Sequence, residues 1–204
     1  MEANEGHFQW CRSGADPHRG YQIAVHYTNG LYTFADPLSL PGNGYARWLL
    51  NQAPRPDPES SMNCTEVIFL AAEEQRAVSL EQLQGLYARA AQQGQLHGDT
   101  LRGFHGVIWD ALHYRSARSL APRGAVRRGD LVIFFDGVGA PCHAGVALGR
   151  TLAGQPLLAD LMGTRGEGIQ IRTVEQGVAY RRSLNIATSD VRIARAPWDP
   201  TSPL

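Results

Sequence analysis

The sequence predicts an α+β fold in which helices pack on an antiparallel β-sheet. Between residues 64 and 115 the apolar residues recur at helical spacing, whereas after Pro122 they form short runs typical of strands. Because the helical segments precede the strands instead of alternating with them, we expect an antiparallel sheet. The length of 204 residues is enough for one domain with a full core, so we expect residues 1–204 to form a single domain.

The first 59 residues are expected to form a β-hairpin and a connector. Residues 20–35 alternate in apolar character around Asn29-Gly30, and this dipeptide between alternating runs is the strongest short-range hairpin signal. Prolines in alternate positions within residues 53–60 forbid a helix and favour an extended connector. Residues 60–196 would then form the main core.

Three helices are predicted in the first half of this core. The first covers residues 64–77 and is apolar almost all round, so other elements must cover most of its surface. The second covers residues 79–94 and begins with a capping box formed by Ser79 and Gln82. The third covers residues 100–115. Strands follow at residues 130–136, 143–149, 157–162, 168–173 and 191–196.

Cys64 is the candidate nucleophile. Asn63 and Glu66 stand at capping-box spacing, which predicts that Asn63 caps the helix and that Cys64 is its first residue. At that position the positive end of the helix dipole lowers the pKa of a thiol and favours the reactive thiolate. The alternative is that Cys64 is a small buried hydrophobic residue, as most free cysteines are.

His143 is the candidate base, at the start of a strand that follows a glycine-containing loop, and we expect its ring at a sheet edge. A base histidine needs a hydrogen-bond acceptor on its other ring nitrogen. If Gly149 and Gly154 close a hairpin, the antiparallel register places Asp160 directly opposite His143, within reach of the ring. The alternative for Asp160 is an ion pair with Arg165 at the end of the strand.

The composition argues against several kinds of partner. The 19 basic residues balance 19 acidic ones, so the chain lacks the charge that binds nucleic acid or an anionic membrane. No apolar run is long enough to span a membrane and the amino terminus lacks a Sec-type signal, so we expect synthesis in the cytoplasm. Three cysteines, Cys11, Cys64 and Cys142, leave at least one thiol free.

No metal or cofactor is expected. His97, His105 and His113 are eight residues apart and form no close ligand pair such as those of zinc sites. The sequence contains no Walker loop, no G-x-G-x-x-G motif after a strand and no G-x-S-x-G elbow.

Every basic residue is an arginine, and the chain contains no lysine. A GC-rich genome explains this, because it also favours Ala, Gly and Arg. A toxin that must survive in a foreign cytosol explains it as well, because a chain without lysine offers no side-chain amine to ubiquitin. The composition leaves both explanations open.

Three segments together resemble the NlpC/P60 and CHAP group of papain-like cysteine hydrolases. In that group a cysteine opens a buried helix, a strand beginning Gly-Asp follows, and a further strand carries the base histidine. Here these features correspond to Cys64, residues 129–135 and residues 143–146, and Asp160 falls at the place of the group's third polar residue. The resemblance covers residues 60–175 and implies a papain-like fold.

The sequence also departs from the group's pattern. The nucleophile lies in Asn63-Cys64-Thr65-Glu66 instead of the Asp-Cys-Ser-Gly common in NlpC/P60 proteins, although Cys-Thr is CHAP-like. Asp160 stands where the group usually has His, Asn or Glu. The segment before Cys64 has no counterpart, and no cell-wall-binding module is recognisable.

The sequence thus predicts a cysteine hydrolase that cleaves an amide bond through an acyl-thioester. Cys64 attacks, His143 transfers the proton and Asp160 orients the ring. The backbone N–H of Cys64 holds the oxyanion together with a second donor, either the side chain of Asn63 or another group. The resemblance implies a peptidoglycan peptide as substrate. Without a Sec signal, the enzyme would need a dedicated export route, as bacterial effector toxins have, and a cognate inhibitor protein is then an expected partner.

Two alternatives remain. The same residues would serve a deamidase, transglutaminase or protease that acts on a protein of another cell, a target that the missing lysines favour. The second alternative is a papain-like module without catalytic activity, which predicts that Cys64 titrates as an ordinary thiol.

Overall fold

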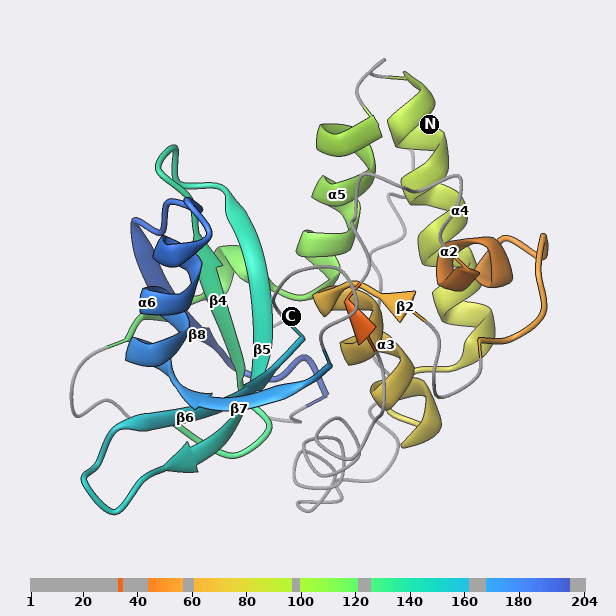
Figure 1. Cartoon of the computed structure of the whole chain (residues 1–204). Helices are drawn as coiled ribbons and strands as arrows, with labels where there is room; N and C mark the ends of the chain where they lie inside the picture. Colours follow the sequence, from red (N-terminus) through yellow and green to blue (C-terminus); the bar gives the residue numbers. More distant parts are fainter. Residues whose placement is uncertain are drawn as a thin grey trace.

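A computed structural model of the chain describes residues 33–34, 44–56, 61–96, 100–120, 126–161 and 168–198. Within these residues the fold is α+β with an antiparallel sheet, as the sequence predicted. Helices α2 to α5 lie on one side of the molecule, and the sheet with helix α6 lies on the other (Figure 1). Among the described helices, none is long and apolar enough to cross a membrane.

The helical side is built around α3 (Cys64–Glu74), whose first nine residues are all buried, as its apolar circumference predicted. The helix stops three residues earlier than expected because Arg76 adopts a positive φ of 56°, which no helix can continue through. Helix α4 (Leu80–Leu96) begins directly after Ser79, the first residue of the predicted capping box. In that box the Ser79 hydroxyl accepts from the backbone N–H of Gln82 at 3.1 Å.

Two further helices complete this side. Helix α5 (Thr100–Ala111) ends four residues before the predicted end, because His113 has a positive φ of 56° and a short 3₁₀ helix, η2 (Tyr114–Ser116), follows. Helix α2 (Gly44–Leu49) was not predicted. Its apolar face joins the same core as α3 and α4, through Tyr45, Ala46, Trp48 and Leu49.

The segment before α3 contributes one short strand pair. Strand β1 (Thr33–Phe34) pairs in parallel with β2 (Ser61–Met62), which leads directly into α3. The predicted hairpin around Asn29-Gly30 lies outside the described residues, except for its last part in β1. Residues 53–56 of the proline connector have no regular structure, and residues 57–60 lie outside the description.

The main sheet has six antiparallel strands in the order β3-β8-β4-β5-β6-β7. Four of the strands are β4 (Leu131–Phe135), β5 (Pro141–Arg150), β6 (Pro156–Asp160) and β7 (Gln170–Thr173). The other two are β3 (Arg118–Ser119), which was not predicted, and β8 (Asp190–Ala194). The ten-residue β5 lies between β4 and β6 and is therefore an inner strand.

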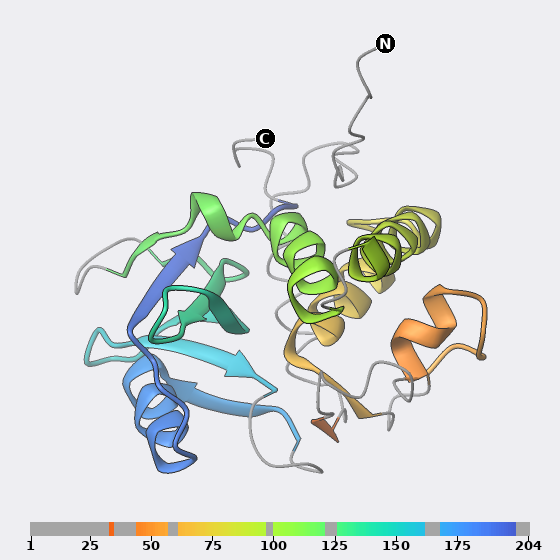
Figure 2. The same ribbon diagram turned by 90° about the horizontal axis from the view of Figure 1, so that it is seen from above.

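The two faces of the sheet are buried against different helices. Leu131, Ile133 and Phe135 of β4 join the large core shared with α2 to α5, whereas Val132 and Phe134 join a smaller core. That smaller core includes residues of α6 (Val174–Ser183), which covers the face of the sheet away from α3 to α5 (Figure 2). Helix α6 was not predicted, although Thr173 and Gln176 form a capping box at its start.

Candidate active site

The start of α3 is held by its cap, and this fixes the position of Cys64. Asn63 Oδ1 accepts from the backbone N–H groups of Thr65 and Glu66, each at 3.0 Å. Glu66 Oε2 accepts in return from the backbone N–H of Asn63 at 2.9 Å. The predicted capping box is thus confirmed, and Cys64 is the first helical residue, with 8% of its surface exposed.

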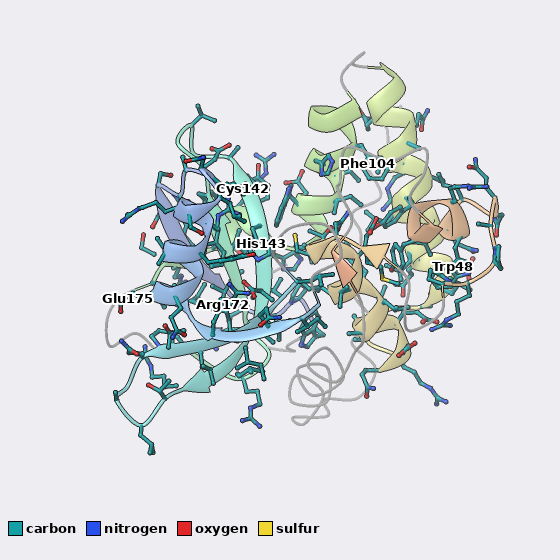
Figure 3. The ribbon with its side chains drawn as sticks, in the orientation of Figure 1. Trp48, Phe104, Cys142, His143, Arg172 and Glu175 are labelled. Carbon is teal, nitrogen blue, oxygen red and sulfur yellow. The ribbon has the colours of Figure 1, made fainter. Side chains whose placement is uncertain are left out.

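His143 lies on β5 beside the start of α3 (Figure 3). It pairs with Phe134 of β4, and the centroids of the two rings are 5.3 Å apart. The expectation of an edge position was wrong: β5 is an inner strand, and the residue is only 2% exposed. Burial removes water as a competing hydrogen-bond partner, so the ring depends on protein groups.

Asp160 closes the far side of the imidazole. It is the last residue of β6 and is completely buried, and its Oδ2 lies 3.3 Å from His143 Nε2. With Nε2 donating to the carboxylate, Nδ1 is the nitrogen left for the thiol. The structure therefore brings together all three residues that the sequence singled out. Arg165, the alternative partner of Asp160, lies outside the described residues.

The register between β5 and β6 differs from the one expected. Asp160 lies opposite Gly145, not opposite His143, because the connecting turn is longer and Arg150 pairs with Pro156. The turn shifts the register by three residues, and a bulge at Leu148 reduces this shift by one, so that the net shift is two residues. Because side chains alternate with a period of two, an even shift keeps Asp160 and His143 on one face. The two residues meet diagonally.

Gly145 makes this diagonal contact possible. A Cβ at this position would lie 2.7 Å from the carbonyl oxygen of Ala159 and 3.0 Å from Cβ of Asp160. Any side chain here would therefore push β6 away from β5. The sequence signal was a glycine inside a predicted strand, which often marks a close approach of two backbones.

The thiol and the imidazole favour each other's charged form. Burial alone would raise the pKa of Cys64, but the charge of His143, a hydrogen bond with its ring, and the backbone N–H of Ala144 together lower it below the usual value. Burial alone would lower the pKa of His143, but the Cys64 charge and the hydrogen bonds to Asp160 and Cys64 raise it to about 9. A thiolate–imidazolium pair is the form that these shifts stabilise.

Cys142 has the opposite character although it precedes His143 directly. It is the extra residue in a bulge opposite Phe134 and Phe135. Its thiol donates to the carbonyl of Phe134 at 3.3 Å, and its sulfur lies 2.9 Å from Nη2 of Arg181. Burial raises the pKa of Cys142 to about 11, against the effect of Arg181. This thiol is therefore protonated at neutral pH.

The Asn63 side chain is only partly available for the oxyanion role expected of it. Its oxygen accepts three hydrogen bonds, from the backbone of Thr65 and Glu66 and from the Thr65 hydroxyl. Its amide nitrogen takes no part in the cap, so only that end could donate to an oxyanion.

Arg172 was not predicted as part of the site. Its Nε lies 3.1 Å from Asp160 Oδ1, in an ion pair whose N–H does not align as a hydrogen bond. An open groove of about 520 Å³ runs along β7 and α6 beside it, lined by Gln170, Ile171, Arg172, Gln176 and Tyr180. Within the described ranges, no group of three or more His, Cys, Asp or Glu residues could hold a metal ion.

No family model and no curated protein matches the sequence. Among solved structures, the fold is similar to an N-acetylmuramoyl-L-alanine amidase from Bacteroides uniformis, with a TM-score of 0.49 and 12% sequence identity. The alignment covers 88% of this chain and 99% of that one. A similarity of this extent assigns no role to individual residues.

Proposed function

We propose that the protein is a cysteine hydrolase that cleaves an amide bond through an acyl-thioester intermediate. The observation that carries this is the buried contact from the Cys64 thiol through the His143 ring to the Asp160 carboxylate. A thiol beside an imidazole whose other nitrogen is held by a third group is the arrangement that nucleophilic catalysis by cysteine requires. The distant fold similarity to the amidase carries no part of this assignment.

In the acylation half-reaction, the Cys64 thiolate attacks the carbonyl carbon of the amide and forms a carbon–sulfur bond. The electron pair of the C=O bond moves to oxygen, which gives a tetrahedral oxyanion. As the oxyanion collapses, the carbon–nitrogen bond breaks and the His143 imidazolium gives its proton to the departing amine. The acyl group remains on sulfur as a thioester.

In the deacylation half-reaction, water attacks the thioester carbonyl while the neutral His143 ring accepts a proton from it. The carbon–sulfur bond then breaks, which releases the carboxylic acid and restores the thiolate–imidazolium pair. Asp160 keeps the ring in one orientation through both halves, because its Oδ2 accepts from Nε2.

The oxyanion would lie at the start of α3. The Asn63 cap takes up the N–H groups of Thr65 and Glu66 and leaves that of Cys64 without an acceptor in the part of the chain that the structure describes. Such a backbone N–H at a helix start is suited to a developing negative charge. The amide nitrogen of Asn63 is the second donor that we propose.

For the substrate we propose a peptide of peptidoglycan, and for the protein the role of an effector toxin with a cognate inhibitor. The support for the substrate is the resemblance of the Cys64, 129–135 and 143–146 segments to NlpC/P60 and CHAP hydrolases, and the support for the toxin role is the absence of lysine. For this toxin role we also propose delivery by a dedicated secretion system.

Digestion of purified peptidoglycan tests this proposal. The wild type and Cys142→Ala are expected to release soluble fragments with new amino groups, measured by mass spectrometry. Cys64→Ala is expected to lose this activity by at least ~10³-fold, because no other group can form the acyl intermediate. Equal activity of Cys64→Ala and the wild type would rule out the thioester mechanism.

The absence of lysine also favours a second target, a protein of another cell. In that case the thioester would form from a glutamine side chain with release of ammonia, and water or an amine would complete a deamidation or transglutamination. Ammonia release from a glutamine-rich protein, without turnover of peptidoglycan, would select this alternative. If the alkylation of Cys64 has the pH dependence of an ordinary thiol, the hypothesis of a non-catalytic binding module is the correct one.

A further inference from the structure

We infer that Arg172 is a positioning residue that acts through Asp160 and balances the charge of the buried site. This inference rests on the proposed function, because it concerns the same thiolate–imidazolium pair. The two oxygens of Asp160 face different partners: Oδ2 lies 3.3 Å from His143 Nε2 and Oδ1 lies 3.1 Å from Arg172 Nε. Asp160 therefore links a cation on β5 to a cation on β7.

The position of Arg172 is fixed from three directions. On β7 it pairs with Leu158, so it lies diagonally from Asp160, on the same face of the sheet. Its guanidinium carbon lies 4.6 Å from the ring centroid of Tyr180 on α6, which places a cation over an aromatic face. The Asp160 carboxylate provides the third contact, and the Arg172 side chain is only 12% exposed. Figure 3 shows Arg172 and His143 on the same half of the molecule.

The ion pair between Arg172 and Asp160 balances the charge of the buried groups. Thiolate, imidazolium and carboxylate together carry one excess negative charge, and an uncompensated charge is costly where there is no water. The guanidinium of Arg172, in contact with this carboxylate, brings the sum over these four groups to zero. Without it, the least costly neutral state has a protonated thiol beside the imidazolium–carboxylate pair. Loss of Arg172 should therefore remove the thiolate while leaving every atom of Cys64, His143 and Asp160 in place.

Among the described residues, other charged or titratable groups also lie near the pair: the buried Glu66 of α3, Tyr87 of α4 and Arg181 of α6. Arg181 of α6 helps to lower the pKa of Cys64, after burial, the His143 charge and two hydrogen bonds. Its guanidinium contacts Cys142 Sγ at 2.9 Å and the Thr188 hydroxyl at 2.9 Å. Arg181 is thus held by the neighbouring thiol, whereas the recorded ion pairs of Asp160 are with His143 and Arg172.

Arg192 offers a matched control on the same sheet. Its Nε lies 2.7 Å from Asp190, and its guanidinium carbon lies 4.2 Å from the ring centroid of Phe135. Arg192 therefore has the same kinds of contact as Arg172, an aspartate and an aromatic ring. Its aspartate has no contact with His143 in the described structure, so its loss should not affect the thiol.

The experiment measures iodoacetamide alkylation of Cys64 against pH in the full chain, with the modified peptide quantified by mass spectrometry. Arg172→Gln is expected to move the midpoint upward by at least about one pH unit, a tenfold loss of thiolate at a given pH. Arg172→Lys, which keeps the charge, should move it less, and Arg192→Gln should leave it unchanged. A folded Arg172→Gln variant with the wild-type midpoint would overturn the inference.

A double variant separates charge balance from simple structural support. In Asp160→Asn with Arg172→Gln, both charges are gone, and thiolate plus imidazolium again sum to zero. We expect its midpoint to return toward the wild-type value relative to Arg172→Gln alone. A midpoint shifted at least as far as in Arg172→Gln would show that Arg172 only supports the fold. If Arg172→Gln does not fold, Arg172→Met against Arg192→Met gives the same comparison with the charge removed at each site, and equal midpoints would refute the inference.

These outcomes are distinct from a failure of the proposed function. If the wild-type Cys64 already titrates as an ordinary thiol, the hydrolase proposal itself is wrong. If wild-type Cys64 reacts at low pH and the Arg172 variants do not change this, the hydrolase proposal stands and only the role of Arg172 is refuted.

Discussion

The pKa values of Cys64 and Cys142 are shifted in opposite directions because the two thiols have different surroundings. Cys64 faces an imidazole and a backbone N–H, which outweigh the effect of burial and lower its pKa. Cys142 is governed by burial, which raises its pKa to about 11 although Arg181 contacts its sulfur. The direction of each pKa shift is thus decided by whether the neighbouring charged and hydrogen-bonding groups outweigh burial.

The pH dependence of hydrolysis should differ from that of alkylation. Hydrolysis needs the proton of His143, so the rate should fall about tenfold per pH unit above the raised pKa of about 9. Alkylation needs only the Cys64 thiolate and should not fall there. Rates measured from pH 5 to 10.5 for both reactions check this. Parallel profiles would show that the imidazolium is not the proton donor.

The same shifts bear on stability. The raised pKa of His143 gives stability that is full below pH 6.5, the unfolded value, and is lost as pH rises through about 9. The lowered pKa of Cys64 gives stability that is present above pH 9.0, its unfolded value, and is lost as pH falls through the folded value. The two slopes oppose each other below pH 9 wherever both groups titrate, so we expect urea unfolding to show little dependence on this pair there.

Replacement of Asn63 by serine separates its two roles. Serine caps a helix about as well as asparagine, so the free energy of unfolding should change by less than about 0.5 kcal/mol. Serine lacks the amide nitrogen, so kcat should fall by about 10²-fold if that nitrogen stabilises the oxyanion. Ser79→Asn at the cap of α4 is the control, with both quantities unchanged. An unchanged kcat in Asn63→Ser would leave the backbone N–H of Cys64 as the donor at this site.

The sequence was enough to single out Cys64, His143 and Asp160, which the structure brings together, and to predict the cap formed by Asn63 and Glu66. These residues can be recognised by their chemical type and by their spacing in the sequence. Arg172 could not be found in this way, because its contact with Asp160 depends on how β6 and β7 align. Local patterns do not determine the alignment of strands that are joined by longer segments.

At the element scale, the β5–β6 pair determines the distance between His143 and Asp160. The two strands approach closely at Gly145, where a Cβ would meet the backbone of Ala159 at 2.7 Å. The bulge at Leu148 sets the even register shift. Neither the bulge nor the turn length is encoded by a local motif, so the direct pairing expected from the sequence was wrong.

Substitution of Gly145 by alanine should separate these strands. We expect a loss of about 1–3 kcal/mol in the free energy of unfolding, because a backbone atom cannot move aside as a side chain can. Alkylation of Cys64 at pH 6 should also slow, since a longer contact with Asp160 weakens the imidazolium. Gly137→Ala is the control, because a Cβ there meets nothing within 4 Å. Equal stability of the two variants, measured by urea unfolding, would contradict the close approach.

The longer helices with an apolar face were predictable, whereas the six-residue α2 and the polar α6 were not. The capping boxes of α3 and α4 marked their first residues, and the apolar stretch of α3 required burial. Helix α6 begins with a capping box of the same kind but has only three buried residues, Val174, Gly177 and Arg181. A helix with so little apolar surface lacks the periodicity by which helices are recognised.

The candidate site joins the helical side of the molecule to the sheet, two parts that are distant in sequence and differ in secondary structure. Cys64 comes from the helical side, whereas His143 and Asp160 come from the sheet (Figure 1). The large core extends across both, from Phe69 of α3 to Ile133 and Ala144 of the sheet. The contact that lowers the pKa of Cys64 therefore exists only when the two sides are packed together.

Unfolding in urea should change the two thiols in opposite directions. Cys142 should become at least about 100-fold more reactive, because its pKa falls from about 11 toward the usual 9.0. Cys64 should become less reactive at pH 6, because it loses the imidazolium. Both changes should share one midpoint with the loss of circular dichroism. Separate midpoints, measured by pulsed alkylation, would show that the helical side and the sheet unfold independently.

The turn between β5 and β6, residues 151–155, lies on the opposite side of the Leu148 bulge from the site. Leu152 at its tip is fully exposed. Residues added there extend a loop that already lies beyond the pairing of Gly145 with Asp160. The tip is therefore a suitable point to insert an affinity tag or a fluorophore, so that the protein can be immobilised or followed without disturbing the contacts among Cys64, His143 and Asp160.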